Sequence, residues 1–148
     1  MMVEEQQPDI PVTILTGFLG AGKTTLLNRI LSENHNYKIA IVENEFGKEN
    51  IDTDLLVQTD REQIVNMNNG CVCCTIRGDL SKVLTDLRLR RSRGEIKFDY
   101  VVIETSGVAN PGSVAQTFFM DDAVAAFFRL DGVVTVVDCK HGSATLDE

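Results

Sequence analysis

The sequence lacks several features that define other classes of protein. No run of about 18 apolar residues occurs in it, so we predict no membrane span and no membrane partner. It has no internal repeat and no Ser/Gly-rich linker, and its 148 residues suit a single domain. Basic residues are scarce, since 14 Lys and Arg stand against 22 Asp and Glu, for a net charge of −8. Because such an acidic surface repels phosphate backbones, we predict no nucleic-acid partner, and any phosphate ligand must be small and locally bound.

The amino terminus also lacks the character of a secretory signal. Residues 1–10 are polar and acidic, whereas a signal peptide begins with positive charge and continues with an apolar segment. We therefore expect a loose arm over residues 1–10 and a cytoplasmic location. In a reducing compartment, the four cysteines favour metal binding or redox chemistry over disulfides.

Apolar segments of two kinds alternate along the chain. Short apolar or β-branched runs predict strands at 12–16, 38–42, 63–67, 100–103 and 132–137. Amphipathic spacing and helix-start signals predict helices over 24–31 and 80–94, and one that begins at 110–111. Strands that are apolar throughout, alternating with helices, indicate an α/β fold with a mostly parallel sheet and helices on both faces.

The strongest motif lies between the first predicted strand and helix. Residues 17–24, GFLGAGKT, match the phosphate-loop pattern G-x-x-x-x-G-K-[ST] in full. Glycines let backbone N–H groups converge on phosphate oxygens, and the helix N-terminus adds a favourable dipole. Lys23 supplies charge to the β- and γ-phosphates, and the Thr24 hydroxyl is a Mg²⁺ ligand. The expected nucleotide-binding residues of this P-loop NTPase are Gly17, Gly20, Ala21, Gly22, Lys23, Thr24 and Thr25.

Glu104 follows a predicted buried strand directly. Ligands of open α/β sheets bind at the carboxyl ends of the strands, so this carboxylate can hold Mg²⁺ through a water or orient the attacking water. Gly107 allows the backbone to approach a γ-phosphate. A solvated glutamate at a strand end is the alternative interpretation. Asp138 ends the next strand with the same placement, and its role stays open.

Three of the four cysteines, Cys71, Cys73 and Cys74, lie within four residues. Thiolates favour Zn²⁺ or a similar ion, and we expect the following helix to lower their pKa. Three alternatives remain: small buried hydrophobes at Cys71 and Cys73, a vicinal disulfide between Cys73 and Cys74, or a redox sensor. Cys139 stands alone and is expected in the core.

A polar, acidic stretch at 43–54 follows the second predicted strand and is expected to be loop. Its position at the ligand edge of the sheet allows Glu43 to complete the thiolate site. Asp52 and Asp54 lie farther along this stretch and could approach Mg²⁺.

Taken together, these motifs resemble those of the CobW-type family of P-loop GTPases, which act as metallochaperones. The matching segments lie at 16–25, 43–47, 69–74, 104–107, 109–112 and 130–138. The resemblance implies GTP hydrolysis coupled to the delivery of Zn²⁺ or Co²⁺ to a client protein. It also implies that residues 11–148 are the N-terminal portion of a GTPase domain, without its guanine-recognition motif [NT]-K-x-D or the C-terminal domain. The triplet at 97–99 follows Ile96 and precedes the Glu104 strand, so we do not assign it to guanine recognition.

Two other functions fit the same motifs. An ATP-dependent small-molecule kinase would need an acceptor pocket and a lid, for which the sequence gives no sign. A zinc- or redox-regulated interaction module would bind nucleotide and hydrolyse it only incidentally. In the favoured function, Lys23 and Glu104 are catalytic and the metal ligands are Thr24 for Mg²⁺ and Glu43, Cys71, Cys73 and Cys74 for Zn²⁺.

Overall fold

The computed structural model describes residues 10–17, 22–44, 63–66, 70–76, 80–105 and 111–140. Six strands and four helices are described, with the following bounds in chain order: β1 (Ile10–Thr16), α1 (Lys23–Ser32), β2 (Ile39–Asn44), β3 (Gln63–Asn66), β4 (Val72–Ile76), α2 (Leu80–Ser92), β5 (Tyr100–Thr105), α3 (Pro111–Met120), α4 (Asp122–Ala125) and β6 (Phe128–Thr135). None of the helices in these ranges combines the length and the apolar character that crossing a membrane requires.

The six strands form one sheet in the order β3-β4-β2-β5-β1-β6. Every pairing is parallel except that between β3 and β4, which is antiparallel. The carboxyl ends of β1, β2, β4 and β5 therefore share one edge, at which the phosphate loop begins. The mostly parallel sheet predicted from the sequence is confirmed.

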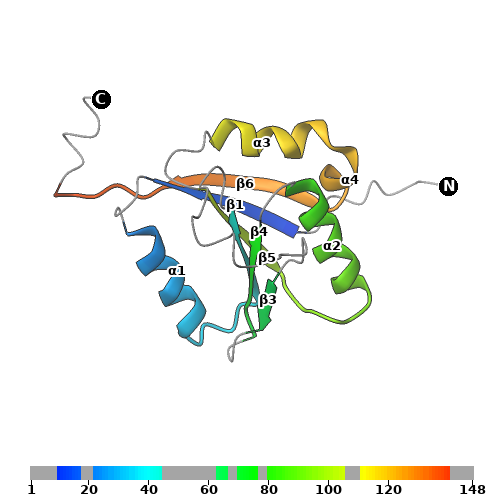
Figure 1. The fold of residues 1–148 in the computed structure, drawn as a ribbon, viewed down its shortest axis with the longest axis horizontal. Coiled ribbons are helices and arrows are strands. Elements are labelled where there is room, and N and C mark those ends of the chain that lie inside the picture. Colours follow the sequence, from blue (N-terminus) through cyan, green and yellow to red (C-terminus); the bar gives the residue numbers. More distant parts are fainter. Residues whose placement is uncertain are drawn as a thin grey trace, which may run out of the picture.

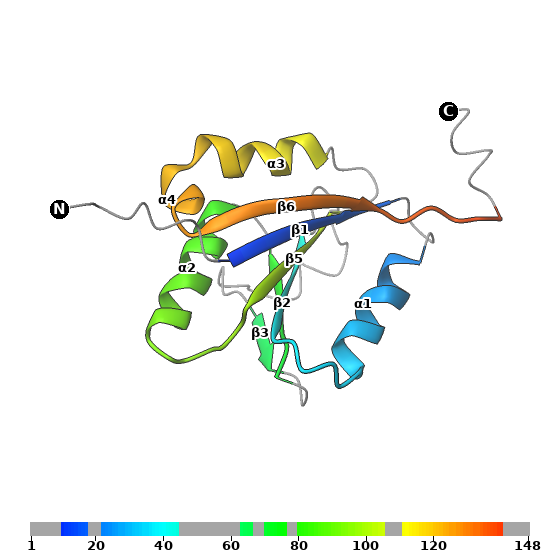
Figure 2. The ribbon, with the colours of Figure 1, turned by 180° about the vertical axis from the view of Figure 1, so that it is seen from behind.

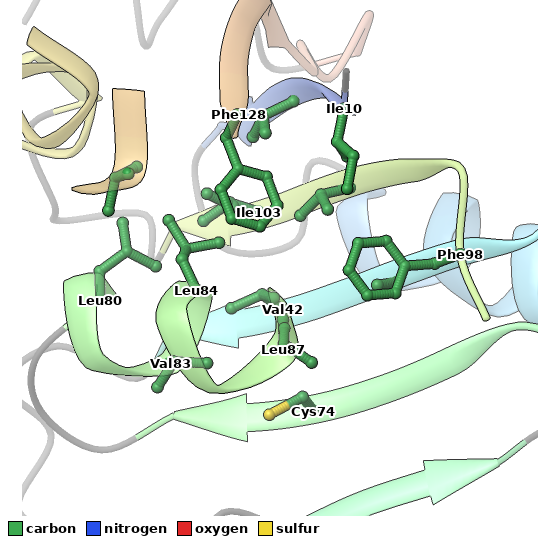
Figure 3. Close-up of a cluster of buried hydrophobic side chains, with 14 of the residues drawn as sticks. Ile10, Val42, Cys74, Leu80, Val83, Leu84, Leu87, Phe98, Ile103 and Phe128 are labelled. Carbon is green, nitrogen blue, oxygen red and sulfur yellow. The ribbon is translucent and has the colours of Figure 1, made fainter. Parts of the chain in front are cut away.

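Helices cover both faces of the sheet, as predicted (Figures 1 and 2). On one face, Leu27 of α1 packs against Leu15, Ile41 and Val102. On the opposite face, α2, α3 and α4 cover the larger core, in which the α2 side chains Leu84 and Leu87 are fully buried (Figure 3). We call these the α1 face and the α2 face. Burial of these side chains is the main force that holds the layers together.

Several boundaries differ from the sequence-based prediction. Ile10 is only 1% exposed and begins β1, so the predicted arm is wrong at this position; residues 1–9 lie outside the described ranges. β2 continues to Asn44, which places Glu43 in a strand rather than a loop. Backbone pairing with β4 and β5 on both sides extends β2 this far.

The last strand also differs from its prediction. β6 begins at Phe128, which is buried and pairs with Ile10, and it ends at Thr135. It is the outer strand of the sheet, and its apolar Val133 and Val134 are about half exposed rather than covered on both faces. The short helix α4 was not predicted; Asp121 caps it by accepting hydrogen bonds from the backbone N–H groups of Ala123 and Val124.

Candidate nucleotide and metal site

Two glycines shape the start and the end of the phosphate loop. Gly17 has φ +146°, and a Cβ there would lie 2.5 Å from the carbonyl oxygen of Val136. This close approach is reinforced by a 2.8 Å hydrogen bond from the Val136 N–H to the Thr16 carbonyl. Gly22 has φ +105° and occupies the N-cap position of α1. Only glycine adopts such backbone angles without strain, so the loop needs both residues for its path.

Lys23 opens α1 and is only 6% exposed. Its Nζ donates a hydrogen bond of 3.0 Å to the backbone carbonyl of Thr105, at the end of β5. The Thr105 hydroxyl in turn donates to the Leu15 carbonyl at 3.4 Å. These contacts hold the ammonium at the carboxyl edge of the sheet, beside the loop that the motif assigns to phosphate.

Two carboxylates lie side by side at the same edge. Glu43 of β2 is the direct cross-strand partner of Glu104 of β5, and both side chains are partly buried. Adjacent strands are about 4.8 Å apart, so the two carboxylates emerge close together on one face. Burial and then the Glu43 charge raise the pKa of Glu104, while the Lys23 ammonium lowers it. Glu104 is thus placed between a second carboxylate and the phosphate-loop lysine.

Cys73 belongs to this group. It pairs with Ile41, which lies two residues before Glu43 on β2, so Cys73 and Glu43 share the α1 face. The pKa of the Cys73 thiol is raised by burial and by the charges of Glu43 and Glu104. The expectation that a helix N-terminus lowers this pKa is wrong for Cys73, because β4 places the thiol among carboxylates.

The structure does not bring the three neighbouring thiols together, contrary to expectation. Successive side chains of a strand point to opposite faces, so Cys74 lies on the α2 face, in the same core as Val83 and Leu87 (Figure 3). Cys71 precedes β4 and is fully buried, with its Sγ 3.9 Å from Nε2 of His35. Across the described residues, no three His, Cys, Asp or Glu side chains are grouped closely enough to hold a metal ion.

The remaining cysteine observations reduce the alternatives. All four cysteines lie in described residues and none forms a disulfide, so the vicinal pair is absent from this structure. Cys71 and Cys74 are buried, as small core side chains would be, whereas Cys73 is only partly buried. Cys139 is exposed rather than in the core, because it follows β6 at the outer edge of the sheet.

The other predicted residues divide into two groups. Thr24 and Thr25, in the first turn of α1, are exposed. Asp138 is partly buried, and its carboxylate accepts a 2.8 Å hydrogen bond from the Lys140 N–H, which is a local turn contact. The predicted residues outside the described ranges are Gly20, Ala21, Asp52, Asp54 and Gly107.

Sequence reasoning missed Thr105. This fully buried residue supplies the carbonyl that holds Lys23 and a hydroxyl that joins β5 to β1. A backbone carbonyl leaves no signature in the sequence. The only available signal was the position of Thr105 directly after Glu104, at the end of a buried strand.

Comparison with known proteins identifies the family to which this domain is similar. Residues 11–148 match the CobW/HypB/UreG nucleotide-binding domain. The zinc chaperone YjiA of Escherichia coli is 47% identical over 139 residues, covering 94% of this chain and 43% of that protein. The zinc-regulated GTPase metalloprotein activator 1 of Schizosaccharomyces pombe is 45% identical over 137 residues, covering 89% of this chain and 32% of that protein.

A solved structure agrees with these sequence matches. The crystal structure of the Zn(II)-bound YjiA GTPase from E. coli superposes with a TM-score of 0.77 and 43% identity, over 93% of this chain and 43% of that one. The chain therefore spans less than half the length of these relatives. With the phosphate loop, the sheet order and the sequence all in agreement, the chain belongs to the CobW/HypB/UreG family of nucleotide-binding domains.

Proposed function

We propose that this chain binds GTP with Mg²⁺, hydrolyses it, and holds Zn²⁺ or Co²⁺ beside the nucleotide for delivery to a client protein. The observation that carries the proposal is the shared edge of the sheet. There Glu43, Cys73 and Glu104 lie on one face, within electrostatic reach of each other, and Lys23 faces Glu104 from the phosphate loop. The names of the relatives, a zinc chaperone and a zinc-regulated GTPase, support the same function.

In this proposal, residues of the chain divide the work of hydrolysis. Lys23 leaves the Thr105 carbonyl and donates to the β- and γ-phosphate oxygens, while Glu104 orients the attacking water. The oxygen donors Thr24 and Glu104 suit Mg²⁺, which when bound neutralises charge on the phosphates. Water then attacks the γ-phosphorus, the bond to the β-γ bridging oxygen breaks, and GDP and inorganic phosphate are released. Gly107 and the glycines of the phosphate loop provide backbone N–H groups.

The metal to be delivered is held at the same edge. Glu43 and Cys73 supply a carboxylate and a thiol on one face, a donor pair that suits Zn²⁺ or Co²⁺. Cys71 and Cys74 complete the site only if β4 changes conformation, because Cys74 is buried on the α2 face and Cys71 is buried beside His35, ahead of β2. A partly built site of this kind suits an ion that must be released again to a client.

The proposal also covers the length of the whole protein and its location in the cell. Residues 11–148 form the N-terminal portion of a longer GTPase, in keeping with the 43% of YjiA that they cover. The protein works in the cytoplasm. Four cysteines outside any disulfide are in keeping with a reducing compartment.

A titration of nucleotide turnover with metal tests the proposal. Phosphate release from Mg²⁺·GTP and Mg²⁺·ATP is followed while free Zn²⁺ is raised in a metal buffer. We expect the turnover of GTP to respond to Zn²⁺, and the response to be lost in Cys73→Ser. Turnover that ignores Zn²⁺ contradicts coupling and favours the interaction module, while faster phosphate transfer from ATP to a small acceptor favours the kinase.

A further inference from the structure

A surface cavity of about 550 Å³ lies where the end of α3, the helix α4 and the start of α2 come together (Figure 1). Most of the side chains that line it are polar, and they include Ser81 of α2, Gln116 and Thr117 of α3, and Asp121 and Asp122 at the start of α4. The apolar side chain of Met120 forms part of the same wall. None of these residues belongs to the proposed nucleotide or metal site.

The end of α3 exposes two large apolar side chains beside this cavity. Phe119 is 74% exposed and Met120 is 82% exposed, the highest values among the large apolar side chains that the structure describes. Val114 and Phe118 attach the same helix to the core, so Phe119 and Met120 take no part in that packing. Adjacent apolar side chains left in water in this way are typical of a surface that contacts another protein.

The cavity is also negatively charged. Hydrogen bonds from the Ser81 hydroxyl and from two backbone N–H groups of α4 lower the pKa of Asp121, so its carboxylate is ionised at neutral pH. Asp122 is exposed, and none of the ion pairs among the described residues includes it or Asp121. The carboxyl end of α3 adds the negative end of a helix dipole and has no basic residue in its last turn. A cation in the cavity would therefore meet negative charge from three sources.

We propose that this α3–α4 surface, which comprises the cavity with Phe119 and Met120, binds a segment of another protein in which a lysine or arginine adjoins an apolar side chain. The cationic group pairs with Asp121 and Asp122 in the cavity, and its aliphatic stem lies along Met120. The apolar neighbour covers Phe119. This contact uses no residue assigned to the nucleotide or the metal, so it stands apart from the proposed function.

Other occupants fit the α3–α4 surface less well. A second copy of the chain, with its own net charge of −8, would bring further acidic residues to a negative surface. Nucleic acid is repelled for the same reason. A metal ion would leave Phe119 and Met120 in water, and the described residues contain no group of three metal-binding side chains. A segment that is both basic and apolar matches the charge of the cavity and the apolar side chains beside it.

The first test measures the fluorescence anisotropy of a labelled peptide, Gly-Leu-Arg-Gly-Leu-Arg-Gly, titrated with the full-length protein without nucleotide or metal. Two matched peptides replace both arginines by glutamate or both leucines by serine. We expect no detectable binding of the glutamate peptide, because its charge has the same sign as the cavity. The serine peptide should bind roughly tenfold more weakly, since it buries less apolar surface. Equal binding of all three peptides overturns the proposal.

Variants of the protein locate the binding of the arginine peptide. Asp122→Asn should weaken it roughly two- to fivefold, as the loss of one exposed ion pair does. Met120→Ala should weaken it roughly fivefold through lost apolar contact. Asp99→Asn is the matched control, because it removes the same charge from an exposed position outside the cavity. It should bind as the wild type does, and circular dichroism checks that each variant is folded. Equal weakening in Asp99→Asn, or wild-type affinity in Asp122→Asn and Met120→Ala, overturns the proposal.

A photoreactive benzoylphenylalanine at position 119 of the full-length protein identifies what covers the α3–α4 surface in cells. Mass spectrometry of the cross-linked peptides should find a segment of another protein with a lysine or arginine beside an apolar residue. A cross-link to the remainder of the same chain, to a second copy or to an acidic segment overturns the proposal, as does the absence of any cross-link.

Discussion

Cys73 and Cys74 are neighbours in sequence and occupy two different chemical environments. Cys73 lies on the α1 face near the carboxyl edge, where Glu43 and Glu104 surround it with negative charge. Cys74 is 1% exposed on the α2 face and packs among hydrocarbon side chains of α2 (Figure 3). The α1 face of β4 therefore places Cys73 among charged groups, whereas its α2 face contributes Cys74 to the hydrophobic core.

The difference teaches that a compact cysteine motif is not necessarily a compact site. In a loop or a helix turn, Cys-x-Cys-Cys could converge on one ion. In an extended strand, successive residues point to opposite faces, and residues two apart, such as Cys71 and Cys73, lie about 6–7 Å apart along the chain. A three-thiolate site on this chain therefore requires β4 to leave its extended state.

The largest expected effect is that of replacing Lys23. Lys23→Ala removes the ammonium that we propose binds the phosphates, so GTP turnover should fall roughly 10²- to 10³-fold. Because Lys23 also donates to the buried Thr105 carbonyl and interacts with Glu104, the variant should remain folded but melt at a somewhat lower temperature. Steady-state phosphate release and calorimetric melting measure the two effects. Near wild-type turnover would remove Lys23 from the site.

Replacing Cys73 and Cys74 one at a time tests directly whether their environments differ in function. Cys73→Ser should lose most zinc affinity and leave stability unchanged, while Cys74→Ser should keep zinc affinity. Cys74→Ser places a hydroxyl in an apolar core and should lower the free energy of unfolding by about 1–3 kcal/mol. Chelator competition and urea unfolding separate the two outcomes. Equal loss of zinc affinity in both variants would mean that β4 rearranges to bring both thiols to the metal.

The dependence of zinc affinity on pH tests whether Cys73, on the α1 face, binds the metal as a thiolate. The thiol of Cys73 must lose its proton to bind metal, and burial and the two carboxylates raise its pKa. Below that raised pKa, zinc affinity should increase with pH by roughly tenfold per unit. Chelator competition measured from about pH 6 to about pH 8, where the Cys73 thiol is mostly protonated, gives this slope. In Cys73→Ser this slope should disappear; a flat profile in the wild type would argue against thiolate ligation.

The smallest expected effect is one of stability. Burial and Glu43 raise the pKa of Glu104, so its ionised form is less favourable in the folded state than in the unfolded chain. The associated stability is present at acid pH and is lost as pH rises through the raised pKa. Glu104→Gln should therefore melt a few degrees higher than wild type at neutral pH, and this gain should vanish below the usual pKa of glutamate. A gain that is the same at every pH would point to packing instead.

The sequence predicted the parts of the molecule that local patterns encode. Residues 17–24 predicted the phosphate loop because they match the motif in full, and the apolar runs predicted the parallel sheet. The side of the sheet to which each cysteine points depends on whether Val72–Ile76 is a strand, and a segment of 5 residues with two adjacent cysteines carries little strand signal of its own. Glu43 and Glu104 are paired although they lie 61 positions apart in the sequence, and no local pattern encodes this pairing.

The position of β1 has a consequence for the biogenesis of the protein. The first of the described strands in chain order, β1 pairs with β5 and β6, the last two strands of the described sheet. Until residue 100 and beyond have been synthesised, both backbone edges of β1 remain without their native partners. Contacts so distant in sequence slow folding and prolong the exposure of a strand prone to aggregation. The nascent chain therefore carries its phosphate loop, already synthesised, on a strand that must wait for β5 and β6.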